Sequence, residues 1–215
     1  ISCDTCHADG GHDGQTWDFT GRGEGLRRTT DQRGRSGIGN GNVHWSGNFD
    51  EIQDFEHDIR GPFGGTGFLD LTPNEFATFH PTSASGKTGL SPELDALAAY
   101  VASLGNAETP RSPDRDSDGT FSEAAIRGQT LFTGENCASC HSGDALTDSP
   151  VGSIDSHPLF DVGTLSAISG ARLGGANLAG IDTPSLHGLH ASRTYLHNGE
   201  ASSLDEVFSY AAGDL

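Results

Sequence analysis

Two five-residue segments constrain this chain more than any other feature. Residues 3–7 read Cys-Asp-Thr-Cys-His and residues 137–141 read Cys-Ala-Ser-Cys-His, so the motif Cys-x-x-Cys-His occurs twice. Its spacing lets two thiols add to the two vinyl groups of one porphyrin and places an imidazole beneath the iron. The sequence therefore predicts two covalently attached haem c groups. The expected attachment points are Cys3, Cys6, Cys137 and Cys140, and the expected proximal iron ligands are His7 and His141.

Other uses of four cysteines are disulfides, a four-cysteine zinc site, or a redox-active Cys-x-x-Cys pair. None of these requires a histidine directly after the second cysteine, yet both motifs have one. The repeated histidine favours haem over the three alternatives.

The composition is unusual for a folded chain. Leu, Ile, Val and Phe together make up 42 of 215 residues, and 12 basic against 30 acidic side chains give a net charge of 12 − 30 = −18. Few aliphatic residues with a high net charge are typical of disorder. Two porphyrin rings would supply the missing apolar surface, so we expect the haem-free chain to be largely unfolded.

The same composition restricts the partners. An acidic chain is a poor ligand for DNA, RNA or an anionic membrane, whereas a basic protein partner is allowed. No apolar run approaches the 18 residues of a membrane span. The sequence starts with Ile rather than Met, which indicates that a leader segment or more has been removed.

A diverged internal repeat predicts two homologous domains. Trp45-Ser46-Gly47 is followed by Ile52 and Phe55, and His197-Asn198-Gly199 is followed at the same spacing by Leu204 and Val207. We expect haem domains at residues 1–107 and 120–215, joined by a Pro- and Asp-rich linker at 108–119. The first lacks an opening helix and the second a closing helix, so a longer chain or partner chains are expected to supply them.

Local signals place two longer helices. Ser91 is a good N-cap before Pro92, and apolar residues at helical spacing continue to Leu104. A second helix is expected to start near Ser122 and to lead into Cys137, and short helices are expected after Asp50 and Ser203. The predicted fold class is mostly α, with two cytochrome c-like haem domains and long Gly-rich loops.

The motifs resemble those of the bacterial di-haem cytochrome c peroxidase superfamily, which includes the methylamine-utilisation di-haem enzymes. The resemblance is carried by segments 161–164, 182–186, 195–199 and 204–207, which read Asp-Val-Gly-Thr, Asp-Thr-Pro-Ser-Leu, Tyr-Leu-His-Asn-Gly and Leu-Asp-Glu-Val, and by His44-Trp45-Ser46-Gly47. It implies two facing c-type haem domains, with Trp45 between the haems.

One departure from this superfamily concerns the peroxidase chemistry. Its peroxidases carry a Gln ten positions after the Trp and an acid ten positions later, but these positions hold Phe55 and Gly65 here. Neither side chain can transfer a proton. The acids at positions 51, 54, 56 and 58 are expected to form the solvated face of a helix instead.

The sequence does not determine the second axial ligand of either haem iron. The chain contains no methionine, which excludes His/Met ligation from its own residues. His57, His44 and His197 are the principal candidates for distal ligands or haem-pocket residues, and the histidines at 157, 187 and 190 are further candidates.

An acidic segment predicts a cation site in the linker. Asp114, Asp116 and Asp118 precede Gly119 in the pattern Asp-x-Asp-x-Asp-Gly, the first half of a calcium loop. The twelfth position is Ala125 rather than the expected Glu. An acidic linker that caps the next helix is the alternative.

The sequence thus favours a di-haem c-type cytochrome that transfers electrons between redox proteins. One alternative is a peroxidase-like oxidoreductase with one open haem, and the other is a haem-bearing subunit or module of a larger redox assembly. Haem c is attached outside the cytoplasm, so a periplasmic or extracellular location is expected.

Overall fold

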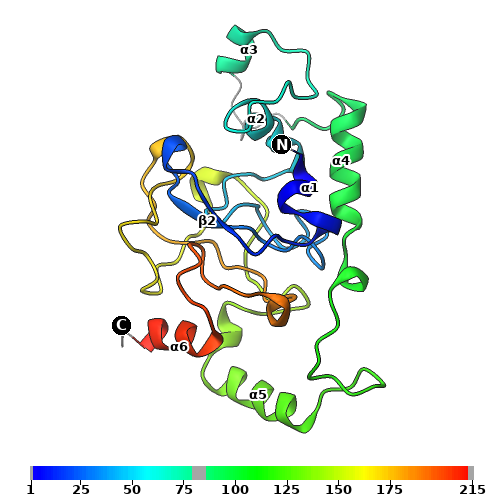
Figure 1. Cartoon of the computed structure of the whole chain (residues 1–215), viewed down its shortest axis with the longest axis vertical. Coiled ribbons are helices and arrows are strands. Elements are labelled where there is room, and N and C mark those ends of the chain that lie inside the picture. The colour runs from blue at the N-terminus through cyan, green and yellow to red at the C-terminus, as the bar shows by residue number, and fades with distance from the viewer. Residues whose placement is uncertain (1, 79–85, 213–215) are drawn as a thin grey trace.

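The computed structural model describes residues 2–78 and 86–212. Short helices surround a body of loops, and α5 and α6 both lie toward the end of the molecule opposite α3 (Figure 1). The α-helices are α1 (Cys3–Cys6), α2 (Phe55–Arg60), α3 (Pro73–Thr78), α4 (Pro92–Ser103), α5 (Glu123–Gly134) and α6 (Leu204–Ala212). Single 3₁₀ turns are η1 (Ala8–Gly10), η2 (Thr20–Arg22), η3 (Ile52–Asp54), η4 (Asn106–Glu108), η5 (Cys137–Ser139), η6 (Ile154–Ser156), η7 (Leu173–Gly175) and η8 (Leu189–Ala191).

The described strands form one small sheet. β1 (Thr16–Asp18) and β2 (Leu26–Arg28) pair antiparallel, with Thr16 opposite Arg28. No described helix is long and apolar enough to cross a bilayer.

The expected fold class, mostly α with two cytochrome c-like haem domains, is wrong. The longest described helices have 12 residues, and most of the chain consists of turns and irregular loops. The physical reason is the glycine content: 31 residues are Gly, and many of those described adopt positive φ, which ends regular helices. The division of the chain at 108–119 stays a prediction.

The individual helix signals are confirmed. Ser91 caps α4, because its side-chain oxygen accepts a hydrogen bond from the Leu94 amide at 3.2 Å. Ser122 caps α5 through the Ala125 amide, also at 3.2 Å. The short helices after Asp50 and Ser203 are η3 with α2, and α6.

The apolar core is thin. Its buried centre is Val43, Phe49 and Ile52, against which α4 packs Ala98 and Val101. Many more polar than apolar side chains are buried among the described residues. Burial of polar groups is tolerated only where they are paired, so hydrogen bonds and ion pairs hold much of this body together.

Two glycines allow the first and second halves of the chain to meet. Gly25 and Gly170 both have positive φ, and a Cβ on Gly25 would lie 2.5 Å from the Ile168 carbonyl oxygen. This close approach lets the Leu26 amide donate to that same carbonyl at 3.0 Å. Arg27 then reaches across to the Ser169 and Ala171 carbonyls at 2.6 and 2.9 Å.

The expectation that the acids of residues 51–58 form a solvated helix face is wrong. Asp54, Glu56 and Asp58 are at most 1% exposed. Each carboxylate has a cationic partner: Asp54 contacts Lys87, Glu56 accepts from Arg60 Nε at 2.6 Å, and Asp58 pairs with Arg22 at 2.8 Å. Arg60 lies one turn along the same helix, but Lys87 and Arg22 come from segments that the local sequence pattern does not reveal.

Candidate functional site

Both Cys-x-x-Cys-His segments fold into one helical turn. In α1 the His7 amide donates to the Cys3 carbonyl at 2.9 Å, and after η5 the His141 amide donates to the Cys137 carbonyl at 3.0 Å. All four cysteines are free thiols. In the first motif the turn places both thiols and the histidine along one cavity, and in the second it places Cys140 and His141 along another.

The two histidines are held in the same way. His7 Nδ1 donates to the Gly11 carbonyl at 3.0 Å, and His141 Nδ1 donates to the Leu146 carbonyl at 3.2 Å. A backbone carbonyl on Nδ1 fixes the tautomer whose Nε2 carries a free lone pair. Burial also lowers the pKa of His7, which keeps this imidazole neutral.

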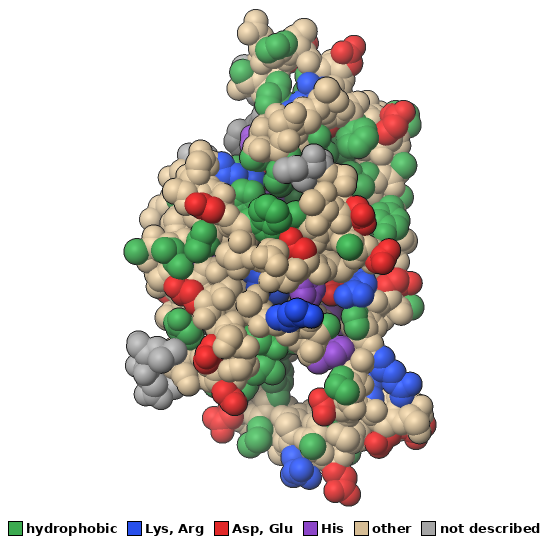
Figure 2. Space-filling model, viewed as in Figure 1, with side chains coloured by type: hydrophobic (Ala, Val, Ile, Leu, Met, Phe, Trp, Pro, Cys, Tyr) green, Lys and Arg blue, Asp and Glu red, His purple; other side chains and the backbone are tan. Residues whose placement is uncertain are grey.

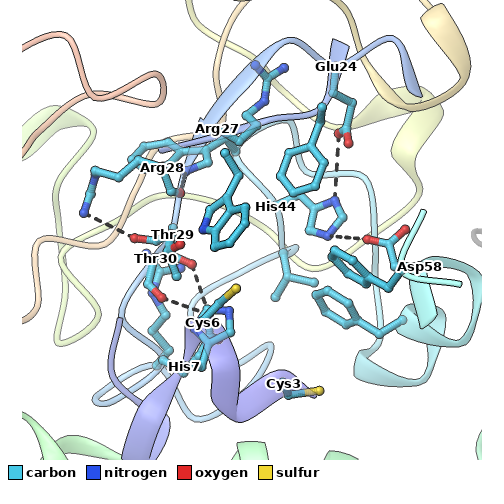
Figure 3. A pocket seen from close by; sticks show the side chains of 18 of the residues that line it. Cys3, Cys6, His7, Glu24, Arg27, Arg28, Thr29, Thr30, His44 and Asp58 are labelled. Atoms are coloured by element: carbon cyan, nitrogen blue, oxygen red, sulfur yellow. Dashed lines mark hydrogen bonds and ion pairs between the residues drawn. The ribbon is translucent and has the colours of Figure 1, made fainter. Parts of the chain in front are cut away.

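The first motif faces a cavity of about 260 Å³. Cys3, Cys6 and His7 lie on one side of it, and His44 lies on the other, between Glu24 and Asp58 (Figure 3). The apolar part of the lining is largely aromatic. Its members include Trp17, Phe19, Val43, Trp45, Phe55, Ile59 and Phe63.

A charged network surrounds His44. Its Nε2 lies 3.4 Å from Asp58 Oδ2, and its Nδ1 lies 4.0 Å from Glu24 Oε1. Arg22 joins the two acids, because its Nη atoms donate to both Asp58 oxygens at 2.8 and 3.1 Å and its Nε lies 2.9 Å from Glu24 Oε2. The His44 ring also packs on Phe49, with 4.3 Å between ring centroids.

Burial sets the protonation of this network. It lowers the pKa of His44, although the nearby Asp58 charge acts in the opposite sense. Burial alone would raise the pKa of Asp58, but the hydrogen bonds from His57 and Arg22 and the charge of Arg22 hold it below its usual value. The cavity therefore presents a neutral imidazole beside an ionised carboxylate, an arrangement that can hold or transfer a proton.

The second motif faces a cavity of about 250 Å³, lined by Cys140 and His141. Phe160, Val162 and Leu204 contribute apolar side chains that are 40–62% exposed. The molecule is visibly hollowed between its body and α5, the helix that leads into this motif (Figure 2).

Trp45 lines both cavities. Its Nε1 donates to the Arg28 carbonyl at 2.8 Å, and its own carbonyl accepts from the Asp182 amide at 2.9 Å. The Arg28 guanidinium lies 5.3 Å from the centre of the Trp45 ring. The indole is therefore fixed in the wall between the cavities.

The candidate distal histidines lie in different places. His44 lines the first cavity and His197 lines the second, whereas His57 lies outside the lining of both. His57 contacts Asp58 at 3.3 Å and Phe76 at 5.9 Å between ring centroids. His197 Nε2 lies 2.7 Å from Ser169 Oγ, and burial lowers its pKa to about 4.

Asp182 links both cavities to a buried histidine. It lines both cavities, and its Oδ1 lies 2.8 Å from His157 Nε2 while its Oδ2 accepts from Ser149 Oγ at 2.9 Å. His187, by contrast, uses Nε2 to donate to the Asp144 carbonyl at 2.8 Å.

The acidic linker forms turns around its own side chains. Asp118 accepts from the amide and hydroxyl of Thr120 at 3.0 and 2.7 Å. Among the described residues no group of three or more His, Cys, Asp or Glu side chains is placed to hold a metal ion. A calcium ion at Asp114, Asp116 and Asp118 stays a prediction.

The geometry of both cavities fits a covalently attached haem. Cys3 and Cys6 line the first cavity and Cys140 lines the second, and each cavity has a histidine held through Nδ1, an apolar part of the lining and arginines. The porphyrin supplies four ligands to a haem iron. One protein histidine in each cavity can therefore suffice to hold the iron.

Comparison with known proteins identifies one relative. The chain is similar to the gamma subunit of a hydrazine synthase. It is 28% identical over 247 aligned residues to hydrazine synthase subunit gamma of Kuenenia stuttgartiensis, covering 99% of this chain and 65% of that subunit. The chain thus spans just under two thirds of the length of the relative, which by its name is one subunit of a larger enzyme. No protein-family model matches the sequence.

A solved structure shows the same fold. It is a structure of hydrazine synthase of Kuenenia stuttgartiensis pressurised with xenon. The match covers 95% of this chain and 70% of the chain in that structure, with a TM-score of 0.60 and 23% identity. These matches correct the resemblance to the di-haem peroxidase superfamily. They also correct the main function predicted from it, a di-haem c-type cytochrome that only carries electrons, because the similarity is to a subunit of a synthase.

Sequence reasoning missed several cavity residues. No spacing rule connects either motif to the charged residues that come from η2, β2 and the loops, namely Arg22, Arg28, Glu24 and Arg35. The sequence pattern predicts a solvated position for Asp58, which is buried. The one sequence feature that points to buried charges is the shortage of aliphatic side chains in a Gly-rich chain, and it does not say which charged residues are buried.

Proposed function

We propose that this chain is a haem-bearing subunit or module of a larger redox assembly that makes hydrazine or a related nitrogen compound. The similarity to hydrazine synthase subunit gamma supports the assembly and the chemistry. The observation that supports a haem cofactor is the similar geometry of the two histidines. Each forms a hydrogen bond from Nδ1 to a backbone carbonyl, and each follows two free cysteines in its motif.

In this proposal two haem c groups are bound. Cys3 and Cys6 attach the first, Cys137 and Cys140 attach the second, and His7 and His141 are their proximal ligands. Haem c is attached outside the cytoplasm, which supports a periplasmic or extracellular location. The partners are other subunits of the assembly and redox proteins that exchange electrons with it.

The first cavity is the better candidate for chemistry. A bound haem supplies an iron that changes oxidation state and accepts axial ligands. The chain supplies the acid–base group: His44 Nε2 faces Asp58, and Arg22 keeps that carboxylate ionised. Aromatic side chains line the same space.

The second cavity is the better candidate for electron storage or relay. His197 faces it but is neutral at ordinary pH, because burial lowers its pKa to about 4. Trp45 lies in the wall between the cavities and places an aromatic ring on the path from one to the other.

Isolation of the full-length protein from its native cells tests this function. Native mass spectrometry is expected to show haem on this chain and association with other subunits, and the assembly is expected to form hydrazine from inorganic nitrogen compounds. A haem-loaded monomer that forms no hydrazine under any partner combination would contradict the proposal.

His44→Gln is expected to lower the turnover of the assembly by about 10²-fold or more, because the proton-transferring imidazole is replaced by an amide of similar size. Haem content should be unchanged. His190→Gln is the matched control, since His190 is exposed and lines neither cavity. If the two variants have equal activities, His44 does not transfer a proton in the reaction.

A further inference from the structure

Two arginines lie where the cavities meet. Arg28 and Arg35 line both cavities, as do Thr30 and Asp182. Arg28 is buried and Arg35 is half-buried. Cations withdrawn from water in this way need anionic or hydrogen-bonding partners.

The two guanidiniums have few partners within the chain. Arg28 Nε donates to the Leu196 carbonyl at 3.3 Å and Nη1 to the Thr29 carbonyl at 3.4 Å, both long for hydrogen bonds. In the part of the chain that the structure describes, the Arg35 guanidinium forms no hydrogen bond or ion pair; only its backbone amide donates, to the Gln32 carbonyl at 3.3 Å. Asp182 and Asp31 act on it only as more distant charges, and burial lowers its pKa despite them.

Neighbouring arginines show the contrast. Arg22 binds both oxygens of Asp58, and Arg27 donates to three backbone carbonyls. Their guanidiniums are occupied by the chain itself. Those of Arg28 and Arg35 retain donors that face the cavities.

We propose that Arg28 and Arg35 form a shared carboxylate-binding site that receives one carboxylate from each of two haems. The inference rests on the proposed function. A guanidinium matches a carboxylate with two parallel N–H···O bonds, and a haem carries two carboxylate side chains on one edge. Because both arginines line both cavities, one pair of cations can neutralise an edge of each haem.

This site has an electrostatic consequence for both haems. An oxidised haem carries one more positive charge than a reduced one, so a nearby guanidinium stabilises the reduced form and raises the reduction potential. Loss of either cation should therefore lower both potentials rather than one.

Spectroelectrochemistry of the full-length, haem-loaded protein tests the site. Haem content is measured first, so that absence of haem, which would defeat the proposed function, is separated from failure of this inference. Arg35→Gln is expected to lower both haem potentials, and Arg35→Lys is expected to restore much of the loss. Arg193→Gln removes the same charge from an exposed residue two positions from Tyr195 in the second cavity and should change neither potential.

Infrared difference spectra of the unsubstituted protein identify the carboxylate even if Arg35→Gln does not accumulate. Carboxylate bands are expected to change at both redox steps and to shift when the haem carboxylates carry ¹³C. Bands that shift instead with ¹³C-acetate in the buffer would assign the site to a free anion and overturn the proposal. It is equally overturned if Arg35→Gln leaves either potential unchanged.

Discussion

The double variant Cys137→Ala/Cys140→Ala is expected to retain one haem instead of two and to lose the ordered structure of α5 and the second cavity. The reason is that few apolar side chains are buried among the described residues of this part of the chain, chiefly Ile181 and Ala201. α5 has no buried residue, and Val162 and Leu204, which line the cavity, are 62% and 41% exposed. A covalently bound porphyrin would cover this apolar surface and stabilise it by roughly 25 cal/mol for each Å² removed from water.

Haem content by the pyridine haemochrome method and hydrogen exchange of the α5 amides measure this effect. Ser139→Ala is the matched control: it alters the same motif but keeps both thiols, and should retain two haems and a protected α5. Replacing all four cysteines should leave a largely unfolded chain by circular dichroism. Two retained haems in the double variant, or native protection of α5 without the second haem, would contradict the account.

Lys87→Met is expected to lower the free energy of unfolding by about 3–5 kcal/mol, because it leaves buried carboxylates without their cation. Lys87 is the only lysine of the chain, and it is 2% exposed. Its Nζ contacts Asp54 and lies 3.4 Å from Glu51 Oε1, and its amide donates to Glu51 at 2.6 Å.

The loss should grow with pH. Burial already raises the pKa of Asp54 to about 7, even though Lys87 opposes that rise. Removing Lys87 raises this pKa further, so the folded state of the variant holds a proton that the unfolded state releases near pH 4. Stability relative to the unsubstituted protein therefore falls as pH rises above about 7, where the unsubstituted protein ionises Asp54 and the variant does not.

Chemical denaturation at pH 5 and at pH 8 measures both effects. Adding Asp54→Asn to Lys87→Met removes the unpaired charge and should recover stability, most of all at pH 8. A loss below about 1 kcal/mol at both pH values would show that this buried pair contributes little.

Local signals in the sequence predicted local structure well. The caps at Ser91 and Ser122 and the helical spacing that follows them gave α4 and α5, because hydrogen bonds within one turn decide these features. The overall fold was not predictable in this way. Gly25 and Gly170 meet across 145 positions of the chain, and no local pattern encodes that contact.

In the candidate site, too, local features were predictable from the sequence and contacts between distant segments were not. The Cys-x-x-Cys-His motifs fix their own geometry within five residues, and the structure places a cavity at each. The sequence of its helix alone predicts that Asp58 is a surface acid, yet Arg22 from η2 pairs with it in the interior, where it also faces His44. Pairing of charges between distant segments decided which acids are buried, and one sequence does not reveal such pairs.

Intact-mass analysis of the purified full-length protein, combined with its pyridine haemochrome spectrum, tests the central claim most directly. The account predicts the mass of the polypeptide plus two porphyrins that survive denaturation, with the haemochrome bands of thioether-linked haem. A colourless protein, or a mass that matches the polypeptide alone, would contradict it.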